Sequence, residues 1–452
     1  MPGKRRWRFG LLRGLHPAQV IVLGFFLTLA AGTAALMLPI ARAGKGSASF
    51  MEALFTAASA VCVTGLSIVD TRTFWTPFAD VVILVLIQIG GLGVMTFATV
   101  LGIVVARRIG LRTRITAAAE TKTHGIGGIR ALTLRVIKTA MIIEGIIAVI
   151  LWLWWWLFHG EHPLHALWLG IFHAVSAFNN AGFSLFSDSL VGYATDPMIV
   201  LPICAAVIIG GMGFPVLHEL HRTYRRPVHW TMNTRLVLVV SAALLAIGTG
   251  FFLFSEWRNP GTIGDMNFGG KLLTSFTQST MARTAGFNSV DTGAMTSTSW
   301  FGTDILMFIG AGPAGTGGGI KVTTFAVLFF IIFTEVRGEV AVNVFGRRLP
   351  RSTHRQAISV ALLAVAAVVG STMLLLTLED FGLDRTLFEV ISAFATVGLS
   401  TGITPDLPTA AQLVLVALMF IGRLGPITLA TALVLRKRGR LYELPKERPI
   451  IG

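Results

Sequence analysis

Apolar residues along this chain fall into runs of two lengths that alternate in four rounds. Each round has a long apolar run, a short apolar run, a stretch with a glycine, and a second long run. A helix needs about 20 apolar residues to cross a bilayer, so the long runs predict membrane spans and the short runs predict re-entrant half-helices. Non-helical backbone at that depth is tolerated only where it lines a cavity or is buried in protein. The four expected units of span, half-helix and span cover residues 18–106, 131–222, 234–335 and 352–436.

The short runs end in four stretches that repeat one another with a glycine in register. Each copy has a hydroxyl six residues before the glycine, Leu or Phe one residue after it, and Ser or Asn two residues after it. The glycines lie 117, 104 and 112 residues apart: Gly65, Gly182, Gly286 and Gly398. Four similar units at such a period predict a pseudo-fourfold assembly. We therefore expect an all-α membrane protein with eight transmembrane helices and four re-entrant pore helices around one pore.

The residues just before each glycine differ between the copies, so the copies share a backbone shape rather than side chains. Glycine accepts positive φ angles and close approach, which lets consecutive carbonyls turn toward a common axis. Rings of carbonyls that replace the hydration shell of a cation form the filters of potassium channels. A plainer interpretation is four helix-ending glycines in an apolar protein, since glycine is frequent in membrane segments. The common register of four copies favours the filter.

Composition and charge place the chain in a membrane. Of its 452 residues, 54% are hydrophobic and 13% are charged, whereas soluble domains carry about a quarter charged residues. The net charge of +15 would suit nucleic acid, but 28 of the 37 Lys and Arg residues fall in five short segments, at residues 4–13, 107–138, 222–235, 337–355 and 436–448. Basic segments mark the cytoplasmic side, so we expect a multi-pass protein of the cell (inner) membrane with both termini cytoplasmic and no nucleic-acid partner. The expected cytoplasmic segments are 1–17, 107–130, 223–233, 336–351 and 437–452.

Reactive side chains do not gather in any one stretch. Cys62 and Cys204 both lie in apolar surroundings, so we expect neither a disulfide nor a metal site. Histidines, cysteines and carboxylates do not converge on a common segment either. The sequence therefore does not predict an enzyme.

Arg423 breaks the apolar pattern of the last long run. A charge in the middle of a bilayer costs about 2.5 to 3.5 kcal/mol on insertion scales, and it normally faces a water-filled pathway or a partner. We interpret Arg423 as a pore-facing residue whose charge is a barrier to cations or a coupling element. Packing and snorkelling are the alternatives.

A second break is the glycine-rich segment that ends at Lys321. Six glycines and a proline cannot hold a regular helix, so the last span of the third unit must be broken inside the membrane. The segment is not a phosphate-binding loop, because Ile320 precedes the lysine and Val322 follows it, where that motif needs Gly and then Ser or Thr. A break in one unit of four predicts a gate; the alternative is a kinked helix that never moves. The candidate gate residues are Gly310, Gly312, Gly315, Gly317, Gly318, Gly319, Lys321 and Arg423.

A second set of glycines follows the first at a nearly constant offset. Glycine-containing motifs begin 25, 28, 24 and 24 residues after the filter glycines, at Gly90, Gly210, Gly310 and Gly422. Small residues inside spans allow close helix packing. Their offset also predicts room around the axis below the filter.

With these motifs, including Gly422-Arg423-Leu424-Gly425-Pro426, the sequence resembles the Trk/Ktr/HKT superfamily of potassium transporters over essentially its whole length. It is most similar to the membrane subunit of bacterial Ktr systems, since no extra spans precede the first unit. The resemblance implies that the four glycines mark potassium selectivity, that the glycine-rich segment is an intramembrane gate loop, and that Arg423 restricts the pore. Sodium-preferring members carry Ser in the first unit, where this chain has Gly65.

The resemblance also implies partners. Membrane subunits of this kind form homodimers on a ring of cytosolic nucleotide-binding regulatory subunits of the KtrA type. Cys62 departs from the threonine or small residue expected at its position, which makes that part of the first filter unusual.

We therefore predict potassium uptake through a carbonyl-lined selectivity filter that is gated by the glycine-rich segment and Arg423. Potassium is the expected transported ion, sodium is a second candidate, and no prosthetic group is expected. A sodium- or proton-coupled potassium symporter and a sodium-permeable cation transporter of the same fold stay open, as do the regulator's ligand and the dimer contact. The expected filter residues are Cys62, Val63, Thr64, Gly65, Asn179, Asn180, Ala181, Gly182, Arg283, Thr284, Ala285, Gly286, Ala395, Thr396, Val397 and Gly398.

Overall fold

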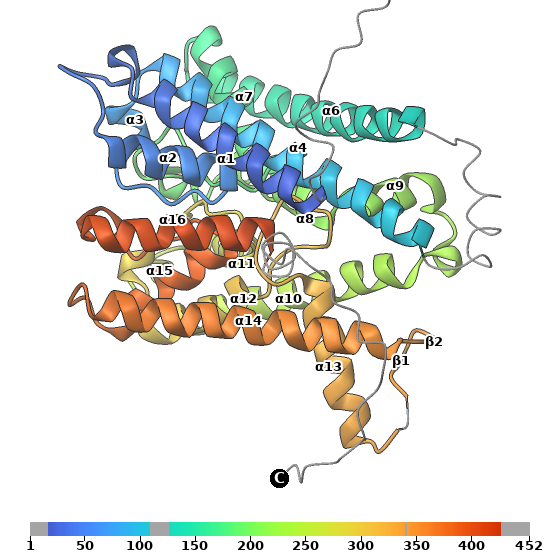
Figure 1. The fold of residues 1–452 in the computed structure, drawn as a ribbon. Helices are drawn as coiled ribbons and strands as arrows, with labels where there is room; N and C mark the ends of the chain where they lie inside the picture. Colours follow the sequence, from blue (N-terminus) through green and yellow to red (C-terminus); the bar gives the residue numbers. More distant parts are fainter. Residues whose placement is uncertain (1–16, 109–125, 340, 426–452) are drawn as a thin grey trace, which may run out of the picture.

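Long helices lie side by side in a bundle that makes up most of the molecule (Figure 1). The computed structural model describes residues 17–108, 126–339 and 341–425. Most of the expected cytoplasmic N-terminus, of the linker 107–130 and of the tail therefore falls outside the described residues. The long helices are α1 (Pro17–Leu36), α4 (Pro77–Arg108), α6 (Ile126–Phe158), α10 (Met232–Ser255) and α14 (Arg351–Leu376).

The four short apolar runs form helices that are too short to cross a bilayer. They have 13, 16, 14 and 13 residues, or about 20 to 24 Å at 1.5 Å per residue, against a hydrocarbon core of about 30 Å. Polar side chains start two of them: Ser49 caps the first and Asn267 the third. All four end at or just before a glycine stretch. These short helices are α2 (Phe50–Cys62), α7 (Pro163–Phe178), α11 (Phe268–Met281) and α15 (Leu383–Ala395).

The last long run of each unit follows its glycine stretch, and in two units it is interrupted. In the third unit α12 ends at Phe308 and α13 begins at Val322, so the glycine-rich segment separates two helices. In the second unit α8 and α9 meet at Gly213 with a bend of 99°, a break that the sequence analysis did not predict. The remaining helices are α3 (Thr71–Phe74), α8 (Pro197–Met212), α9 (Phe214–Thr223), α12 (Ser297–Phe308), α13 (Val322–Val336) and α16 (Thr409–Leu424). One-turn 3₁₀ helices lie at Pro39–Ala41, Val191–Tyr193, Pro227–His229, Thr292–Ala294 and Thr404–Asp406.

Helix contacts close the four units into a ring. The last long helix of each unit packs on the short helix of the next unit: α4 on α7, α8 on α11, and α12 on α15. The fourth contact, α16 on α2, joins the last unit to the first. The four contacts are of the same kind, and they close the series of four units on itself.

Helix length alone identifies fewer spans than the sequence pattern predicts. Within the described residues, three helical segments are long and apolar enough to cross a membrane: Thr133–Phe158, Met232–Ser255 and Arg351–Leu376. The bent pair α8 and α9 passes the same test only when its two helices are taken together. Eight spans therefore stay a prediction.

The described part of the chain departs from an all-α fold at one small hairpin. Strands β1 (Asn343–Val344) and β2 (Arg347–Arg348) pair antiparallel inside the expected linker 336–351. Val342, Val344 and Leu349 of this hairpin pack in a small apolar cluster with residues of α10, α13 and α14. Two larger apolar clusters fill the bundle, and both include residues of the glycine stretches.

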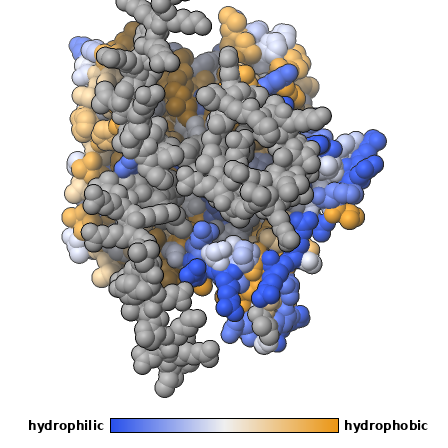
Figure 2. All heavy atoms as spheres, turned by 45° about the vertical axis from the view of Figure 1, so that its right-hand side comes forward, coloured by the Kyte–Doolittle hydropathy of each residue, from blue (hydrophilic) through white to orange (hydrophobic). Residues whose placement is uncertain are grey.

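Exposed arginines gather at the end of the bundle that carries α9 and the hairpin. Figure 2 turns this end toward the viewer and shows hydrophilic residues on it, with hydrophobic residues along the flanks. The exposed arginines of this end include Arg222, Arg225, Arg226, Arg347 and Arg348. Basic segments from the second and third units, far apart in sequence, thus share one end of the molecule.

Candidate ion pathway

The four glycine stretches share the backbone shape expected from their repeat. Each glycine has a positive φ, with values of 92°, 69°, 74° and 97° in chain order. The residue two positions earlier also has a positive φ in every copy, at 57°, 59°, 66° and 50°. The residue between these two has a negative φ in every copy. Because φ alternates in sign along the stretch, successive peptide planes turn toward the same side. The residues with a positive φ before the glycines are Val63, Asn180, Thr284 and Thr396.

The four glycines meet in a closed ring of contacts with neighbouring carbonyls. A Cβ placed on Gly65 would lie 2.5 Å from the carbonyl oxygen of Ala181, and one on Gly182 would lie 2.7 Å from that of Ala285. The series continues around the ring, because a Cβ on Gly286 would overlap the carbonyl of Val397 and one on Gly398 would overlap that of Thr64. Each contact joins one unit to the next, and the fourth returns to the first. We call these four glycines and the carbonyls before them the glycine ring.

The hydroxyl that repeats six residues before each glycine supports the ring in two units directly. Ser59 Oγ accepts a hydrogen bond from the Gly65 N–H at 3.0 Å, and Ser392 Oγ accepts one from the Gly398 N–H at 3.1 Å. In the second unit Ser176 Oγ instead donates to the Phe183 carbonyl at 2.8 Å. In the third unit Thr280 Oγ1 donates to the Phe276 carbonyl of its own helix at 2.9 Å. The repeated hydroxyl therefore stabilises the backbone of its own glycine stretch in three of the four copies.

Two predicted filter residues direct their side chains away from the ring. The amide of Asn179 donates to Gln88 at 2.8 Å and to Glu144 at 3.1 Å, on α4 and α6. The guanidinium of Arg283 donates to the carbonyl and to the hydroxyl of Ser241 on α10, both at 3.1 Å. At these positions only the backbone can face the axis.

Other polar groups next to the ring have no hydrogen-bond partner among the described residues. They are the hydroxyls of Thr64, Thr284 and Thr396 and the amide nitrogen of Asn180. All four residues are buried. A buried polar group without a partner costs free energy unless something else binds it, and hydroxyl oxygens are suitable ligands for a dehydrated cation.

The glycine-rich loop (residues 309–321) lies directly against the ring. A Cβ on Gly317 would overlap the Thr284 hydroxyl, and one on Gly318 would overlap the Thr396 hydroxyl. The loop hydroxyl of Thr316 also donates to Asn180 Oδ1 at 2.7 Å. Three of the four glycine stretches therefore touch this one loop.

Backbone hydrogen bonds fix the loop to α8 and to itself. The N–H of Gly312 donates to Gly211 at 2.8 Å, and that of Thr316 donates to Gly210 at 3.2 Å. The two ends of the loop run together, because the Gly310 N–H donates to the Ile320 carbonyl at 2.7 Å. Gly213, at the bend of the second unit, approaches the Pro313 carbonyl so closely that a side chain there would overlap it.

Two cations hold the loop through its carbonyls. The guanidinium of Arg423, only 4% exposed, donates to the carbonyls of Thr316 and Gly90, the latter at 2.9 Å. The ammonium of Lys321 donates to the carbonyl of Gly317 at 2.5 Å and to that of Gly318 at 3.3 Å. Within the described residues neither cation pairs with a carboxylate, so positive charge lies beneath the ring.

The second set of glycines allows close packing at the ends of the short helices. In three units a Cβ on this glycine would overlap the carbonyl of the residue that lies four positions before the filter glycine of the same unit. The pairs are Gly90 with Val61, Gly210 with Phe178, and Gly422 with Phe394. In the third unit Gly310 contacts the loop carbonyl of Gly318 instead. The loop thus replaces a helix contact that the other three units have.

A carboxylate that the sequence analysis missed supports the fourth stretch. Glu389 of α15 is fully buried and accepts hydrogen bonds from the Ser400 hydroxyl at 2.5 Å, the Thr401 N–H at 2.9 Å and the Thr404 hydroxyl at 2.8 Å. These bonds fix the turn that follows Gly398. An acid among the apolar residues 387–395 was the signal available in the sequence.

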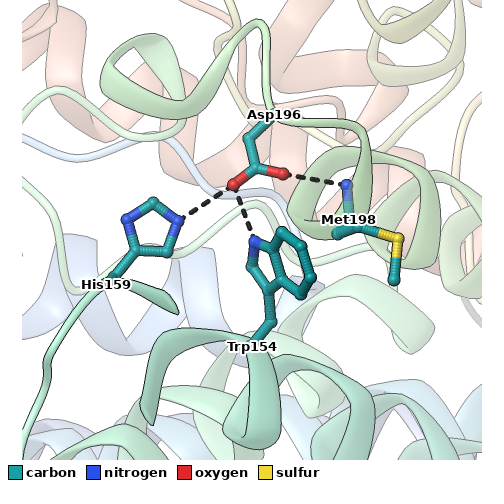
Figure 3. Close-up of polar contacts among 4 residues, drawn as sticks. All are labelled: Trp154, His159, Asp196 and Met198. Carbon is teal, nitrogen blue, oxygen red and sulfur yellow. Dashed lines mark hydrogen bonds and ion pairs between the residues drawn. The ribbon is translucent and has the colours of Figure 1, made fainter. Parts of the chain in front are cut away.

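Another acid ties α6 to α8 at the end opposite the exposed arginines. Asp196 caps α8 through the Met198 N–H at 2.9 Å and accepts from Trp154 at 2.8 Å and His159 at 2.9 Å (Figure 3). Burial alone would raise the pKa of this carboxyl, but the three hydrogen bonds outweigh it and hold its pKa below the ordinary value.

Comparison with known proteins connects this geometry to transporters. Residues 27–441 match the TrkH family model, described as cation transport protein. The chain is 40% identical to the Ktr system potassium uptake protein B of Bacillus subtilis, over 91% of this chain and 92% of that protein. It is 37% identical to the protein of the same name from Vibrio alginolyticus, over 96% and 94% of the two chains. It is also 34% identical to the potassium/sodium uptake protein NtpJ of Enterococcus hirae, over 97% and 98%.

A solved structure gives the same fold. The potassium transporter TrkH from Vibrio parahaemolyticus superposes with a TM-score of 0.73 at 19% identity, covering 95% of this chain and 87% of that one. The resemblance expected from the sequence motifs is thereby confirmed.

Proposed function

Because this chain belongs to the TrkH family of cation transport proteins, we propose that it takes up potassium through the glycine ring. The family consists of transporters, so the chain is a membrane transport protein and not an enzyme. Potassium is the proposed cargo because two relatives at 37% and 40% identity carry potassium uptake in their names. The observation that carries the proposal is the closed ring of contacts among the four glycines and their neighbours' carbonyls.

The ring would act as a selectivity filter. A cation that enters it loses water, and carbonyl oxygens aimed at the axis replace that hydration shell. The alternating sign of φ in each stretch supports this orientation. The C-terminal ends of α2, α7, α11 and α15 adjoin the ring, and the negative end of a helix dipole favours a cation. The proposed filter is residues 62–65, 179–182, 283–286 and 395–398.

Beneath the filter, the glycine-rich loop and Arg423 would form the gate. The loop contacts three of the four stretches, and Arg423 binds it to α4. A positive charge on the path opposes a passing cation, since two like charges 4 Å apart repel by about 4 kcal/mol at an effective dielectric constant near 20. Uptake would therefore need the loop and Arg423 to move aside together.

The topology and the assembly are proposals of the same kind. We place eight spans and four pore helices in the cell membrane. The end that carries Arg222, Arg225, Arg226, Arg347 and Arg348 would lie on the cytoplasmic side, as the positive-inside rule predicts. The names of two relatives refer to a Ktr system, which supports a membrane component that works with a separate regulatory subunit. A homodimer on a cytosolic nucleotide-binding ring is the assembly we propose.

A sodium-permeable or ion-coupled transporter is the second candidate. The relative from Enterococcus hirae is named a potassium/sodium uptake protein at 34% identity. The pore parts that we describe serve a gated channel and a coupled transporter equally well.

Rubidium uptake into liposomes that contain the purified protein tests the proposal. Inside potassium is kept high, and potassium or sodium is added outside as competitor. We expect potassium to block uptake and sodium not to block it. Gly65→Ser should abolish this preference, because any side chain on Gly65 meets the Ala181 carbonyl.

Gly370→Ser is the matched control, since a Cβ on Gly370 meets no atom within 4 Å. Uptake that sodium competes away in the wild-type protein would assign the chain to the second candidate. Unchanged selectivity in Gly65→Ser would contradict the filter.

A further inference from the structure

Glu144 is a buried acid that the proposed pathway does not use. It lies within α6, is 4% exposed, and pairs with no cation among the described residues. Burying a carboxyl group in an apolar helix bundle is costly unless polar groups surround it. Its partners therefore indicate what it is for.

Those partners connect two long helices to the second glycine stretch. Gln88 Nε2 on α4 donates to both carboxyl oxygens of Glu144 at 3.1 Å. Asn179 Nδ2 donates to Glu144 Oε1 at 3.1 Å and to Gln88 Oε1 at 2.8 Å. The three side chains thus close a triangle of hydrogen bonds, with Asn179 completely buried.

Helix α4 has a gap in its side-chain surface where the Asn179 amide fits. A Cβ on Gly91 would overlap the amide group and lie 2.6 Å from its Cγ. Two residues further along the same helix, a Cβ on Gly93 would meet no atom within 4 Å. Gly91 therefore admits the Asn179 side chain into the bundle, and the triangle fixes it there.

The anchored residue is the first of the second filter stretch. Asn179 is the C-cap residue that follows α7, and the Ala181 carbonyl two residues later contacts Gly65 in the ring. At the equivalent position the other units have Cys62, Arg283 and Ala395, and of these Arg283 is anchored to α10. In the second unit the Asn179 amide donates to the Val175 carbonyl of its own helix at 2.9 Å, and its bonds to α4 and α6 depend on the acceptor oxygens of Gln88 and Glu144.

We infer that Glu144 is a positioning residue for the second filter stretch. Together with Gln88 it holds the Asn179 side chain away from the axis, and this keeps the carbonyls of residues 179–181 turned toward the passing ion. Glu144 touches no ion itself and acts through Asn179. This inference rests on the proposed function, because it assigns the residue to the selectivity of that same filter.

Two substitutions of Glu144 separate positioning from packing. Glu144→Leu removes the acceptor oxygens, whereas Glu144→Gln retains one. Each variant is reconstituted as the full chain, and rubidium uptake is measured with potassium or sodium as competitor. We expect Leu to lower the preference for potassium over sodium about tenfold, the equivalent of about one buried hydrogen bond. Gln should stay within about threefold of the wild-type preference, because its amide oxygen still accepts from Asn179.

The informative readout is the ratio of the inhibition of rubidium uptake by potassium to its inhibition by sodium. A residue that only supports packing would lower the amount of folded protein and the maximal uptake, and it would leave the ratio unchanged. Gly91→Ala provides a second test that leaves Glu144 intact, since it displaces the Asn179 amide sterically. We expect it to lower the preference as Glu144→Leu does, while the control Gly93→Ala keeps the wild-type ratio.

A wild-type ratio in both Glu144→Leu and Gly91→Ala would overturn the inference and leave the proposed function standing. A Glu144→Gln variant as damaged as Glu144→Leu would overturn it as well, because positioning needs only an acceptor oxygen. If the wild-type protein showed no preference for potassium, the proposed function would fail and this inference with it.

Discussion

Replacement of Arg423 by Gln tests whether this arginine holds the proposed gate loop closed. The guanidinium ties the loop to α16 and α4, because it donates to the carbonyls of Thr316 and Gly90 at the same time. Gln is shorter and uncharged, and its single amide cannot bridge both carbonyls. The substitution therefore removes a restraint on the loop and a positive charge from the proposed path.

The hydrogen bonds give the expected magnitude. A bond from a charged donor contributes about 1.5 to 3 kcal/mol, so the loss of two such bonds weakens the closed loop by about 3 kcal/mol at the lower limit. Since 1.4 kcal/mol is a factor of ten, the open fraction should rise about a hundredfold while the closed state still predominates. Removal of the charge acts in the same direction, because it lowers the repulsion of an incoming cation.

The assay is rubidium uptake per folded protein in liposomes, without any cytosolic partner. Arg423→Gln should raise the rate strongly. Arg423→Lys should give an intermediate rate, because lysine keeps the charge but cannot donate to two carbonyls in the way that the guanidinium does. Arg258→Gln removes an exposed arginine and serves as the control. A folded Arg423→Gln protein with a wild-type or lower rate would refute the role of Arg423 in the gate.

Three further predictions concern the supports of the ring and the outer end of the bundle. Ser392→Ala removes the acceptor of the Gly398 N–H and should lower the potassium preference about fivefold, for a bond of about 1 kcal/mol; an unchanged competition assay would contradict this. Gly318→Ala should raise basal rubidium uptake several-fold, because its Cβ would displace the loop from Thr396, whereas Gly370→Ala should not. Asp196→Asn should lower the melting temperature at pH 7. The folded pKa of Asp196 is below its ordinary value, so its stabilisation is complete above about pH 4 and is lost as the pH falls further. A melting difference that does not shrink as the pH falls below about 4 would argue against the carboxylate.

The sequence contained the features that repeat, and the structure bears out their backbone shape. Four glycines in register predicted four similar bends, and all four have a positive φ. The composition of the segment before Lys321 predicted a broken helix, and α12 and α13 are separate. Such features depend on local backbone chemistry, which a single sequence records.

Contacts between distant segments could not be predicted in the same way. Asn179 and Arg283 were assigned to the filter by position, but which way their side chains turn depends on Glu144, Gln88 and Ser241, which are 35 to 91 residues away. The bend at Gly213 was also missed. Gly213 and Pro215 are two of several Gly and Pro residues in an apolar run, and the contact that accompanies the bend comes from the loop of the next unit.

The replacement of a helix contact by a loop in the third unit alone has a statistical consequence for opening. If four equivalent gates had to open independently, each with probability p, the path would conduct with probability p to the fourth power. If the one loop against three of the four stretches is the gate, as proposed, the path conducts with probability p. A single local rearrangement would then switch the whole path, and a ligand that stabilised the open loop would change the flux in direct proportion. The fourfold repetition of the fold would carry no penalty in the frequency of opening.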